Sequence, residues 1–231
     1  MIHPSSILDP KATLPRPGAT KEALLDAAEH LFVKAGVAET STRDIIREAA
    51  ANLGAVNYHF GSKDRLVLEV FARRLRPLHA EMIERLAVLE SASGDGGPTL
   101  ERIIEAMIAP IVEVHETQPE HASLLRLICL EVREPGSAVK AFVEEERAEV
   151  AKRFDAAILR AVPALPPGEF LWRMKFVCGA LHCGIEMWTG FDNTTCSGPD
   201  IQPLRLDRNG FVRRFVAFVS AGLSAPIPKD E

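Results

Sequence analysis

The chain has 231 residues, of which 47% are hydrophobic and 26% are charged, and its net charge is −5. These values are ordinary for a soluble globular protein and argue against a protein coated in basic residues. No apolar run approaches the roughly 20 residues that span a bilayer. Residues 1–19 contain four prolines and lack the apolar stretch of a signal peptide. We therefore expect a flexible N-terminal arm over residues 1–19, no membrane association and a cytoplasmic location.

Charge is distributed unevenly along the chain. Residues 1–76 have a net charge of +2, whereas residues 77–231 have a net charge of −7. The first third of the chain is therefore the part suited to face phosphate groups, and the remainder repels them.

The four cysteines do not have the spacing of a metal site. They are Cys129, Cys178, Cys183 and Cys196. No C-x-x-C pair is present, and a C-x4-C spacing matches no common zinc motif. His182 and Glu186 lie near two of these cysteines on one expected helix, but no second cluster supplies the missing ligands. We expect reduced thiols, no metal site and no cofactor.

Apolar residues recur at helical spacing almost throughout the chain, and Gly, Pro and Asn separate the helical segments. The expected helices cover residues 20–36, 41–49, 53–60, 62–90, 99–117, 120–133, 137–161, 168–189 and 208–223. No segment has the period-two alternation of a convincing strand. The predicted fold is therefore all-α, with a three-helix head followed by a helical bundle.

The segment Ser41–Asp64 has the pattern of a helix-turn-helix. Ser41 and Asp44 fit a capping box for one short helix, while Asn52 and Ser62 can cap the next two. Two short helices of this kind need apolar residues that lock them together. The expected lock consists of Ile45, Ile46, Ala51, Val56 and Phe60.

The opposite side of this segment is small, polar and aromatic, as a helix in the major groove requires. The residues expected to face outward are Asn52, Leu53, Gly54, Ala55, Asn57 and Tyr58. Asn57 can pair with an adenine edge, and Ala55 can contact a thymine methyl group. The residues suited to phosphate oxygens are Thr42, Arg43, Tyr58, His59 and Lys63. A solvated connector with Tyr58 as a packing residue is the alternative reading of the same pattern.

The runs LLDAAEHLFVKAGVAETSTRDI and NYHFGSKDRL, in this order and spacing, resemble the N-terminal domain of the TetR/AcrR family of bacterial transcriptional regulators. The resemblance covers residues 20–76, about a quarter of the chain. It implies a homodimeric repressor whose third helix enters the major groove of a pseudo-palindromic, double-stranded DNA operator. It further implies that residues 77–231 form a helical ligand-binding and dimerisation domain, which a small-molecule inducer occupies.

Two positions depart from the pattern of this family. Ala50 stands where the family usually has a turn glycine, so either the alanine is strained by about 1 kcal/mol or the turn differs. Asn57 stands where many members carry tyrosine, and Tyr58 follows one position later, so which of the two contacts a base is open. The AVNYHFGSK version resembles a subset that includes fatty-acid-responsive regulators.

The resemblance also implies an apolar inducer pocket with a few polar anchors in the C-terminal domain. The expected lining residues are Met107, Ile111, Leu127, Trp172 and Phe176. The expected anchors are His115, His121, Arg126 and Glu131. Such a pocket favours an amphipathic or lipophilic inducer, whereas an ordinary helical core is the alternative reading of the same apolar stripes.

Two late segments are expected to form a dimer interface. FVCGALHCGIEMW spaces small residues through an apolar helix, and FVRRFVAFVSAGL is too apolar to stand alone in water. In the family, the last two long helices form a four-helix bundle across a two-fold axis, so the resemblance implies a homodimer. The expected interface residues are Gly179, Ala180, Gly184, Phe215, Val216, Phe218 and Val219.

Two other functions compete with a regulator. One is an enzyme in the helical domain, but no motif places a nucleophile beside an oriented base. The other is a helical interaction module with a degenerate DNA-binding head, and the intact caps and phosphate-facing residues argue against it. We therefore predict a ligand-responsive DNA-binding regulator, first of all a dimeric repressor, and no enzymatic activity. The inducer, the operator sequence and the sign of regulation are left open.

Overall fold

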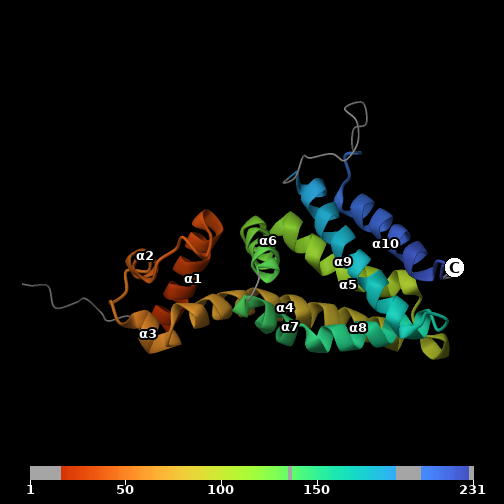
Figure 1. Cartoon of the computed structure of the whole chain (residues 1–231), viewed down its shortest axis with the longest axis horizontal. Helices are drawn as coiled ribbons and strands as arrows, with labels where there is room; N and C mark the ends of the chain where they lie inside the picture. The colour runs from red at the N-terminus through yellow and green to blue at the C-terminus, as the bar shows by residue number, and fades with distance from the viewer. Residues whose placement is uncertain (1–16, 135–136, 191–203, 229–231) are drawn as a thin grey trace, which may run out of the picture. The chain divides into compact units, whose positions relative to one another are not determined.

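The computed structural model describes residues 17–134, 137–190 and 204–228 (Figure 1). Every regular element in these ranges is helical, so the all-α prediction is confirmed. The α-helices are α1 (Pro17–Ala35), α2 (Thr42–Glu48), α3 (Ala55–Phe60), α4 (Lys63–Ala92), α5 (Leu100–Thr117), α6 (Pro119–Arg133), α7 (Ala138–Glu146), α8 (Ala148–Ala161), α9 (Pro167–Thr189) and α10 (Arg208–Ser224). A single 3-10 turn at Gly94–Gly96 separates α4 from α5.

The chain divides into two compact units, one within residues 1–71 and one within residues 72–231. The division falls inside α4, which continues through it from Lys63 to Ala92. The sequence-based boundary at residue 76 falls in the same helix. Most of the expected N-terminal arm, together with Cys196, lies outside the described residues.

The first unit has a core of apolar side chains from α1, α2, α3 and the first turns of α4. The core residues with at most 1% exposure include Leu24, Ala28, Phe32, Ile45, Val56, Leu66, Val70 and Phe71. Two predicted helix starts are wrong here. Thr20 does not cap α1, because α1 begins earlier at Pro17, a residue favoured in the first helical turn. Asn52 does not cap α3, because residues 53–54 form a turn and Gly54 is the N-cap.

The turn between α2 and α3 is a Schellman motif built without glycine. The N–H of Ala51 donates to the C=O of Ile46 (3.0 Å), and the N–H of Ala50 donates to the C=O of Arg47 (3.2 Å). Ala50 has a φ of 48°, in the left-handed region that favours glycine. The sequence left open whether Ala50 is strained or the turn differs, and the structure has a strained alanine at this position.

Ala50→Gly is expected to raise the free energy of unfolding by about 1 kcal/mol, because glycine has no Cβ to clash in the left-handed region. Ala49→Gly is the matched control. Ala49 has a φ of −76°, so glycine there relieves no strain and costs about 0.5–1 kcal/mol. Urea denaturation at one protein concentration measures both variants. Equal destabilisation by the two substitutions contradicts a strained Ala50.

The central helix of the second unit is α5, which packs against α6, α8 and α10. Its side chains Ile104, Ile108 and Val112 recur every four residues and are fully buried. This spacing places them on one face of the helix. Opposing apolar residues, such as Leu124 of α6 and Phe154 of α8, are also buried and complete the core around α5.

The predicted single helix over residues 137–161 is wrong, because Arg147 separates α7 from α8. No Gly or Pro marks the break; Arg147 has φ −92° and ψ −4°. Burial lowers the pKa of His79. Its Nδ1 lies 3.1 Å from the carbonyl oxygen of Glu146, which can only accept, so Nδ1–H is the donor. Arg76 of α4 donates two hydrogen bonds to the carboxylate of Glu146 (2.9 and 2.7 Å). Contacts made by α4 thus accompany a bend that no local signal predicts.

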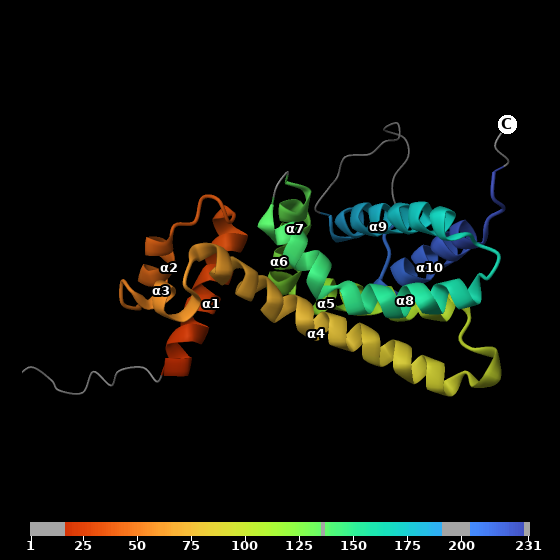
Figure 2. The same ribbon diagram turned by 60° about the horizontal axis from the view of Figure 1, so that its bottom comes forward.

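Helices α9 and α10 lie side by side (Figure 2). The α-carbon of Gly184 faces the ring of Phe211, which comes within 3.4 Å of where a Cβ would stand. Trp188 stacks on the same ring with 5.2 Å between centroids, and its Nε1–H donates to the carbonyl of Leu206 (2.9 Å). None of the helices in the described ranges combines the length and the apolar character that crossing a membrane requires.

Candidate DNA-binding surface and ligand cleft

The outer face of α3 and the turn before it exposes large side chains that fill no core. Tyr58 is 83% exposed and Leu53 is 82% exposed. Asn52, Gly54 and Asn57 are exposed beside them, as predicted. Ala55 is a correction, because it is only 8% exposed and its methyl group packs inside the head with Val56. It therefore cannot meet a thymine methyl group in this conformation.

The N-terminus of α2 is fixed by the predicted capping box. The backbone N–H of Asp44 donates to Oγ of Ser41 (3.2 Å), and the N–H of Ser41 donates to the Asp44 carboxylate (3.3 Å). Hydrogen bonds from Ser41 and Arg47 lower the pKa of Asp44. Thr42 and Arg43 follow in the first turn, where Arg43 is exposed and Thr42 is half-buried. Both lie where unsatisfied backbone N–H groups also favour an anion.

Lys63 and His59 have partners within the head. The ammonium group of Lys63 donates to the carbonyl of Val37 in the turn after α1 (2.7 Å). Lys63 is half-buried at the start of α4, which Ser62 caps by accepting from the N–H of Arg65 (3.2 Å). The half-buried ring of His59 lies edge-on to Tyr58, with 4.9 Å between centroids. The sequence did not predict the hydrogen bond from Lys63 to Val37. The ammonium group of Lys63 has two further N–H donors for a phosphate.

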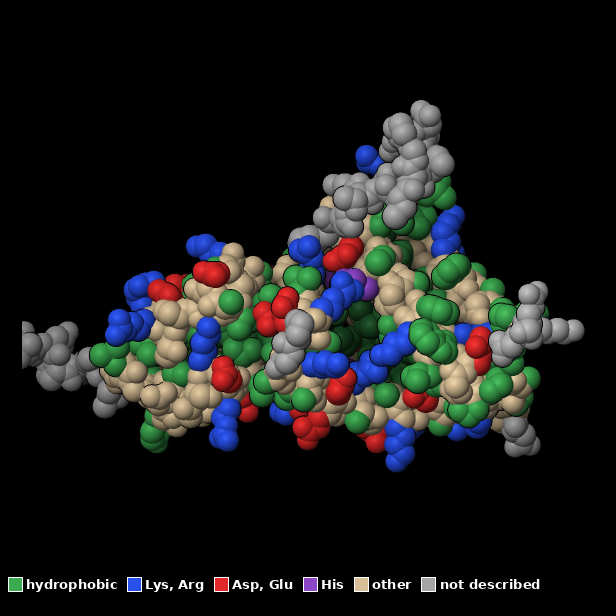
Figure 3. Space-filling view, viewed as in Figure 1, with side chains coloured by type: hydrophobic (Ala, Val, Ile, Leu, Met, Phe, Trp, Pro, Cys, Tyr) green, Lys and Arg blue, Asp and Glu red, His purple; other side chains and the backbone are tan. Residues whose placement is uncertain are grey.

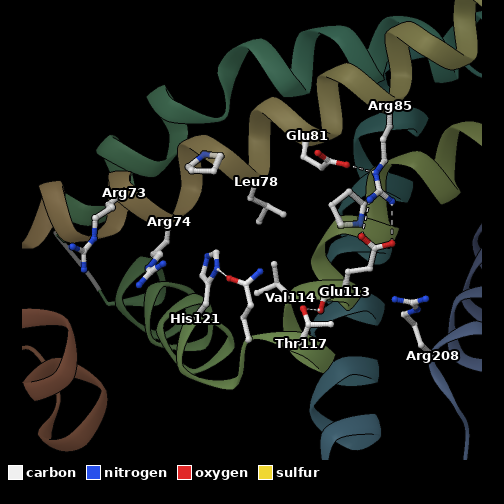
Figure 4. A pocket seen from close by; sticks show the side chains of 13 residues that line it. Arg73, Arg74, Leu78, Glu81, Arg85, Glu113, Val114, Thr117, His121 and Arg208 are labelled. Carbon is white, nitrogen blue, oxygen red and sulfur yellow. Dashed lines mark hydrogen bonds and ion pairs between the residues drawn. The ribbon is translucent and has the colours of Figure 1, made fainter. Parts of the chain in front are cut away.

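A cleft of about 460 Å³ opens in the second unit, bordered by α4, α5 and the first turns of α6 and α10 (Figure 4). Two prolines inside helices, Pro77 of α4 and Pro110 of α5, both line it. Each interrupts the hydrogen-bond ladder of its helix. Leu78 and Val114 add apolar surface to the walls. The remaining lining residues are Arg73, Arg74, Glu81, Arg85, Glu113, Thr117, Gln118, His121 and Arg208.

Arg85 links the two walls of the cleft. Its Nε donates to Glu81 on the same helix (2.7 Å), and its Nη2 donates to Glu113 of α5 (2.6 Å). These hydrogen bonds raise the pKa of Arg85, and the one it donates to Glu113 has the largest effect. His121, a predicted anchor, is 7% exposed, and its Nδ1 lies 3.2 Å from Oε1 of Gln118.

Of the nine residues predicted to contact the inducer, His121 lines this cleft and the other eight do not. Six of them are half-buried elsewhere in the second unit, namely Met107, Ile111, His115, Arg126, Leu127 and Glu131. Burial lowers the pKa of His115, which hydrogen-bonds the carbonyl of Ile111 (2.9 Å). Arg126 lies 3.5 Å from the carboxylate of Glu186 on α9. Trp172 and Phe176 are corrections, because they are 66% and 67% exposed and so lie on the surface of α9 instead of closing a cavity.

The residues predicted for the dimer interface divide into buried and exposed groups. Phe215 and Val219 are corrections, since they are 7% and 2% exposed and belong to the core of the protomer. Gly184 packs on Phe211 of the same chain. Ala180 and Val216 are half-buried, whereas Gly179 is exposed and Phe218 is 70% exposed.

One face of α9 is apolar and exposed along most of its length. Trp172, Phe176, Gly179, Cys183 and Met187 follow one another at intervals of three or four residues, which places them on one stripe. All five are exposed. Figure 3 shows hydrophobic side chains gathered along the visible side of α9. The sequence predicted an apolar surface on this helix but assigned Trp172 and Phe176 to the lining of an internal pocket.

Both parts of the chain match known families. Residues 24–70 match the family described as bacterial regulatory proteins, tetR family. Residues 105–222, half of the chain, match the family described as tetracyclin repressor-like, C-terminal domain. Among solved structures, the regulator FadR of Bacillus subtilis, in complex with stearoyl-CoA, has a TM-score of 0.62 at 13% identity. The similarity covers 89% of this chain and 99% of that one, and it shows a shared fold.

Curated relatives match the chain over a shorter length. The HTH-type transcriptional regulator SrpR of Pseudomonas putida is 30% identical over 45% of this chain and 44% of its own length. An HTH-type transcriptional repressor of Mycobacterium tuberculosis is 42% identical over 33% of this chain and 47% of its own length. The chain thus spans about half the length of these relatives. With both family matches in their expected order, the chain belongs to the TetR family of bacterial transcriptional regulators.

Proposed function

We propose that the protein is a dimeric transcriptional repressor that leaves its DNA operator when a small amphipathic molecule binds the second unit. The exposed face of α3 and its preceding turn carries this proposal. Asn57 and Tyr58 project there from a helix whose other side is buried in the head, and Leu53 projects from the turn before it. Several large side chains exposed next to one another are typical of a binding surface. In a helix-turn-helix, the second helix lies in the major groove, so this face of α3 is the one that contacts DNA in the proposal.

Dimerisation is proposed through the exposed faces of α9 and α10. The stripe from Trp172 to Met187 on α9 and the exposed Phe218 on α10 are apolar surfaces on neighbouring helices. Gly179 allows close approach of a partner helix. A second copy of the chain presents the same surface, so a two-fold axis buries both. Two copies then place two α3 helices on successive turns of one face of the duplex.

The ligand is proposed to act through α4. This helix extends from Lys63 to Ala92 with Pro77 inside it, so its first turns belong to the head and a later part forms one wall of the cleft. A ligand that binds the two conformations of the dimer with different affinities shifts the equilibrium between them. The stearoyl-CoA complex of the FadR neighbour supports an amphipathic ligand for this fold.

Electrophoretic mobility shift tests the proposed DNA binding. The full chain is titrated into the DNA upstream of its own coding sequence, with an equal length of randomised DNA as the control. We expect retardation of the upstream fragment at protein concentrations that leave the control free, at both low and moderate salt. Retardation that is equal for both fragments, or absent for both, contradicts the proposal.

Asn57→Ala is expected to relax base preference, because an amide that pairs with a base edge contributes about 1–3 kcal/mol of discrimination. Tyr58→Phe is the comparison. Loss of a phosphate contact by its hydroxyl weakens binding to all sequences to a similar extent. Fluorescence anisotropy with a panel of single-base operator variants separates the two effects. An unchanged preference profile for Asn57→Ala contradicts the assigned reading role.

A further inference from the structure

The turn before α3 holds a leucine side chain out in solvent. The N–H of Ala55 donates to the C=O of Asn52 (2.9 Å) and closes this turn. Leu53 stands at its corner and is 82% exposed, so it contributes almost nothing to the core of the head. It is not a scattered surface residue, because Asn57 and Tyr58 are exposed beside it on the face proposed to contact DNA.

The residues that follow Leu53 leave its apolar surface uncovered. A Cβ added to the exposed Gly54 would have no neighbouring atom within 4 Å, so this part of the turn admits a close approach by a partner. Ala55 and Val56 are 8% and 1% exposed and face the core. Among residues 52–60, all of which the structure describes, Leu53 is the one exposed side chain built of hydrocarbon alone.

A hydrocarbon side chain restricts what it can recognise in the major groove. Guanine, adenine and cytosine present hydrogen-bonding groups there, whereas thymine adds a methyl group at C5. Leucine makes no hydrogen bond to a phosphate or to a polar base edge. If it covers such an edge, it removes water from that edge and supplies no partner in return, which costs free energy. Leu53 therefore favours a base with a 5-methyl group and disfavours the others.

The two exposed neighbours on α3 are suited to other contacts. Tyr58 is 83% exposed, and its ring lies edge-on to His59, with 4.9 Å between centroids. Its hydroxyl group suits a phosphate oxygen. Asn57 has an amide that suits an adenine edge. Neither side chain is purely apolar, so the contact with a methyl group falls to Leu53.

We propose that Leu53 determines specificity for a pyrimidine 5-methyl group, that of a thymine, at one position in each half-site of the operator. The inference rests on the proposed function for its setting and adds one base-specific contact. The methyl group packs on the leucine side chain and both lose contact with water, which stabilises the complex. The positive net charge of residues 1–76 brings the head to DNA without regard to sequence.

Substitution of single bases tests this contact. The operator is first selected from randomised duplex DNA with the full chain. Each thymine of one half-site is then replaced in turn by deoxyuridine, which lacks only the methyl group. By fluorescence anisotropy at fixed salt, we expect one position at which the affinity falls about fourfold, the effect of burying one methyl group. At that position, 5-methylcytosine is expected to bind about fourfold more tightly than cytosine.

Three variants assign the effect to a residue. Leu53→Ala is expected to bind the thymine and deoxyuridine operators equally, because the shortened side chain no longer reaches the methyl group. Leu53→Met keeps a long apolar side chain and is expected to retain the fourfold difference. Val33→Ala shortens an apolar side chain on α1 that is 38% exposed, and it is also expected to retain the difference. Leu53 is highly exposed, so its replacement changes folding stability little.

Several results overturn the role of Leu53 while the proposed function stands. These are a specific operator without any thymine at which deoxyuridine weakens binding, equal affinity for cytosine and 5-methylcytosine at the sensitive position, or a difference that Leu53→Ala retains. Complete loss of operator binding by Leu53→Ala also overturns it, because a contact with one methyl group contributes only a few-fold. If selection yields no preferred sequence at all, the proposed function fails, and this inference fails with it.

Discussion

Phe218→Glu is expected to convert the protein from dimers to monomers at micromolar concentration. Phe218 is 70% exposed on α10, the helix that packs against α9. In the proposed dimer, the substitution buries one carboxylate from each copy without a partner, and each unpaired buried charge costs several kcal/mol. Size-exclusion chromatography with light scattering measures the mass of the 25.3 kDa chain and of its dimer directly.

The same substitution is expected to weaken operator binding by about a hundredfold or more, because a monomer contacts one half-site and loses the gain from linked binding. Val88→Glu is the matched control. Val88 is 64% exposed on α4, outside the proposed interface, so the same change in charge leaves both mass and affinity unaltered. A dimeric Phe218→Glu protein, or a monomeric unsubstituted protein, contradicts the proposed interface.

Arg173→Met is expected to lower the free energy of unfolding by about 3–5 kcal/mol, the usual cost of breaking a buried charged network. Arg173 is 7% exposed. Its Nη1 donates to the carbonyls of Gly222, Leu223 and Ala225 at the end of α10 (3.0, 3.0 and 2.7 Å). Its Nε donates to Glu169 (2.8 Å). Methionine fills part of the space but donates to none of these oxygens.

Arg102→Met is the control for this experiment. Arg102 is 66% exposed and has a single ion pair with Glu105 one turn along α5 (3.8 Å). Its loss is expected to change the free energy of unfolding by less than about 1 kcal/mol. Urea denaturation at one fixed protein concentration measures both variants. A similar small change for Arg173→Met contradicts the view that this arginine joins α9 to the end of α10.

The sequence predicts the helices of this protein well where local chemistry marks them. Ser41 and Asp44 form the expected capping box, and Ser62 caps α4 as expected. The bend at Arg147 is different, because no local signal marks it and the contacts that accompany it come from residues about 70 positions earlier, on α4. Single-sequence periodicity does not contain such long-range contacts, so α7 and α8 were predicted as one helix.

Residue roles were harder to predict than helices. Trp172 and Phe176 have the apolar character of core residues, and only the packing of α9 reveals that they face outward. Phe215 and Val219 have the same character on α10 and face inward. The cleft residues Arg73 and Arg74 were assigned no role from the sequence. The one local signal for the site was the pair of prolines within helices, Pro77 and Pro110.

Hydroxyl-radical footprinting on the DNA upstream of the coding sequence tests the central claim most directly, because it reports specificity and dimer geometry together. A two-fold dimer with one α3 helix per copy is expected to protect two similar half-sites on one face of the duplex. Their centres are expected to lie about 10 base pairs apart or a multiple of this spacing. A single protected half-site, or protection without preference for any sequence, contradicts a dimeric helix-turn-helix repressor.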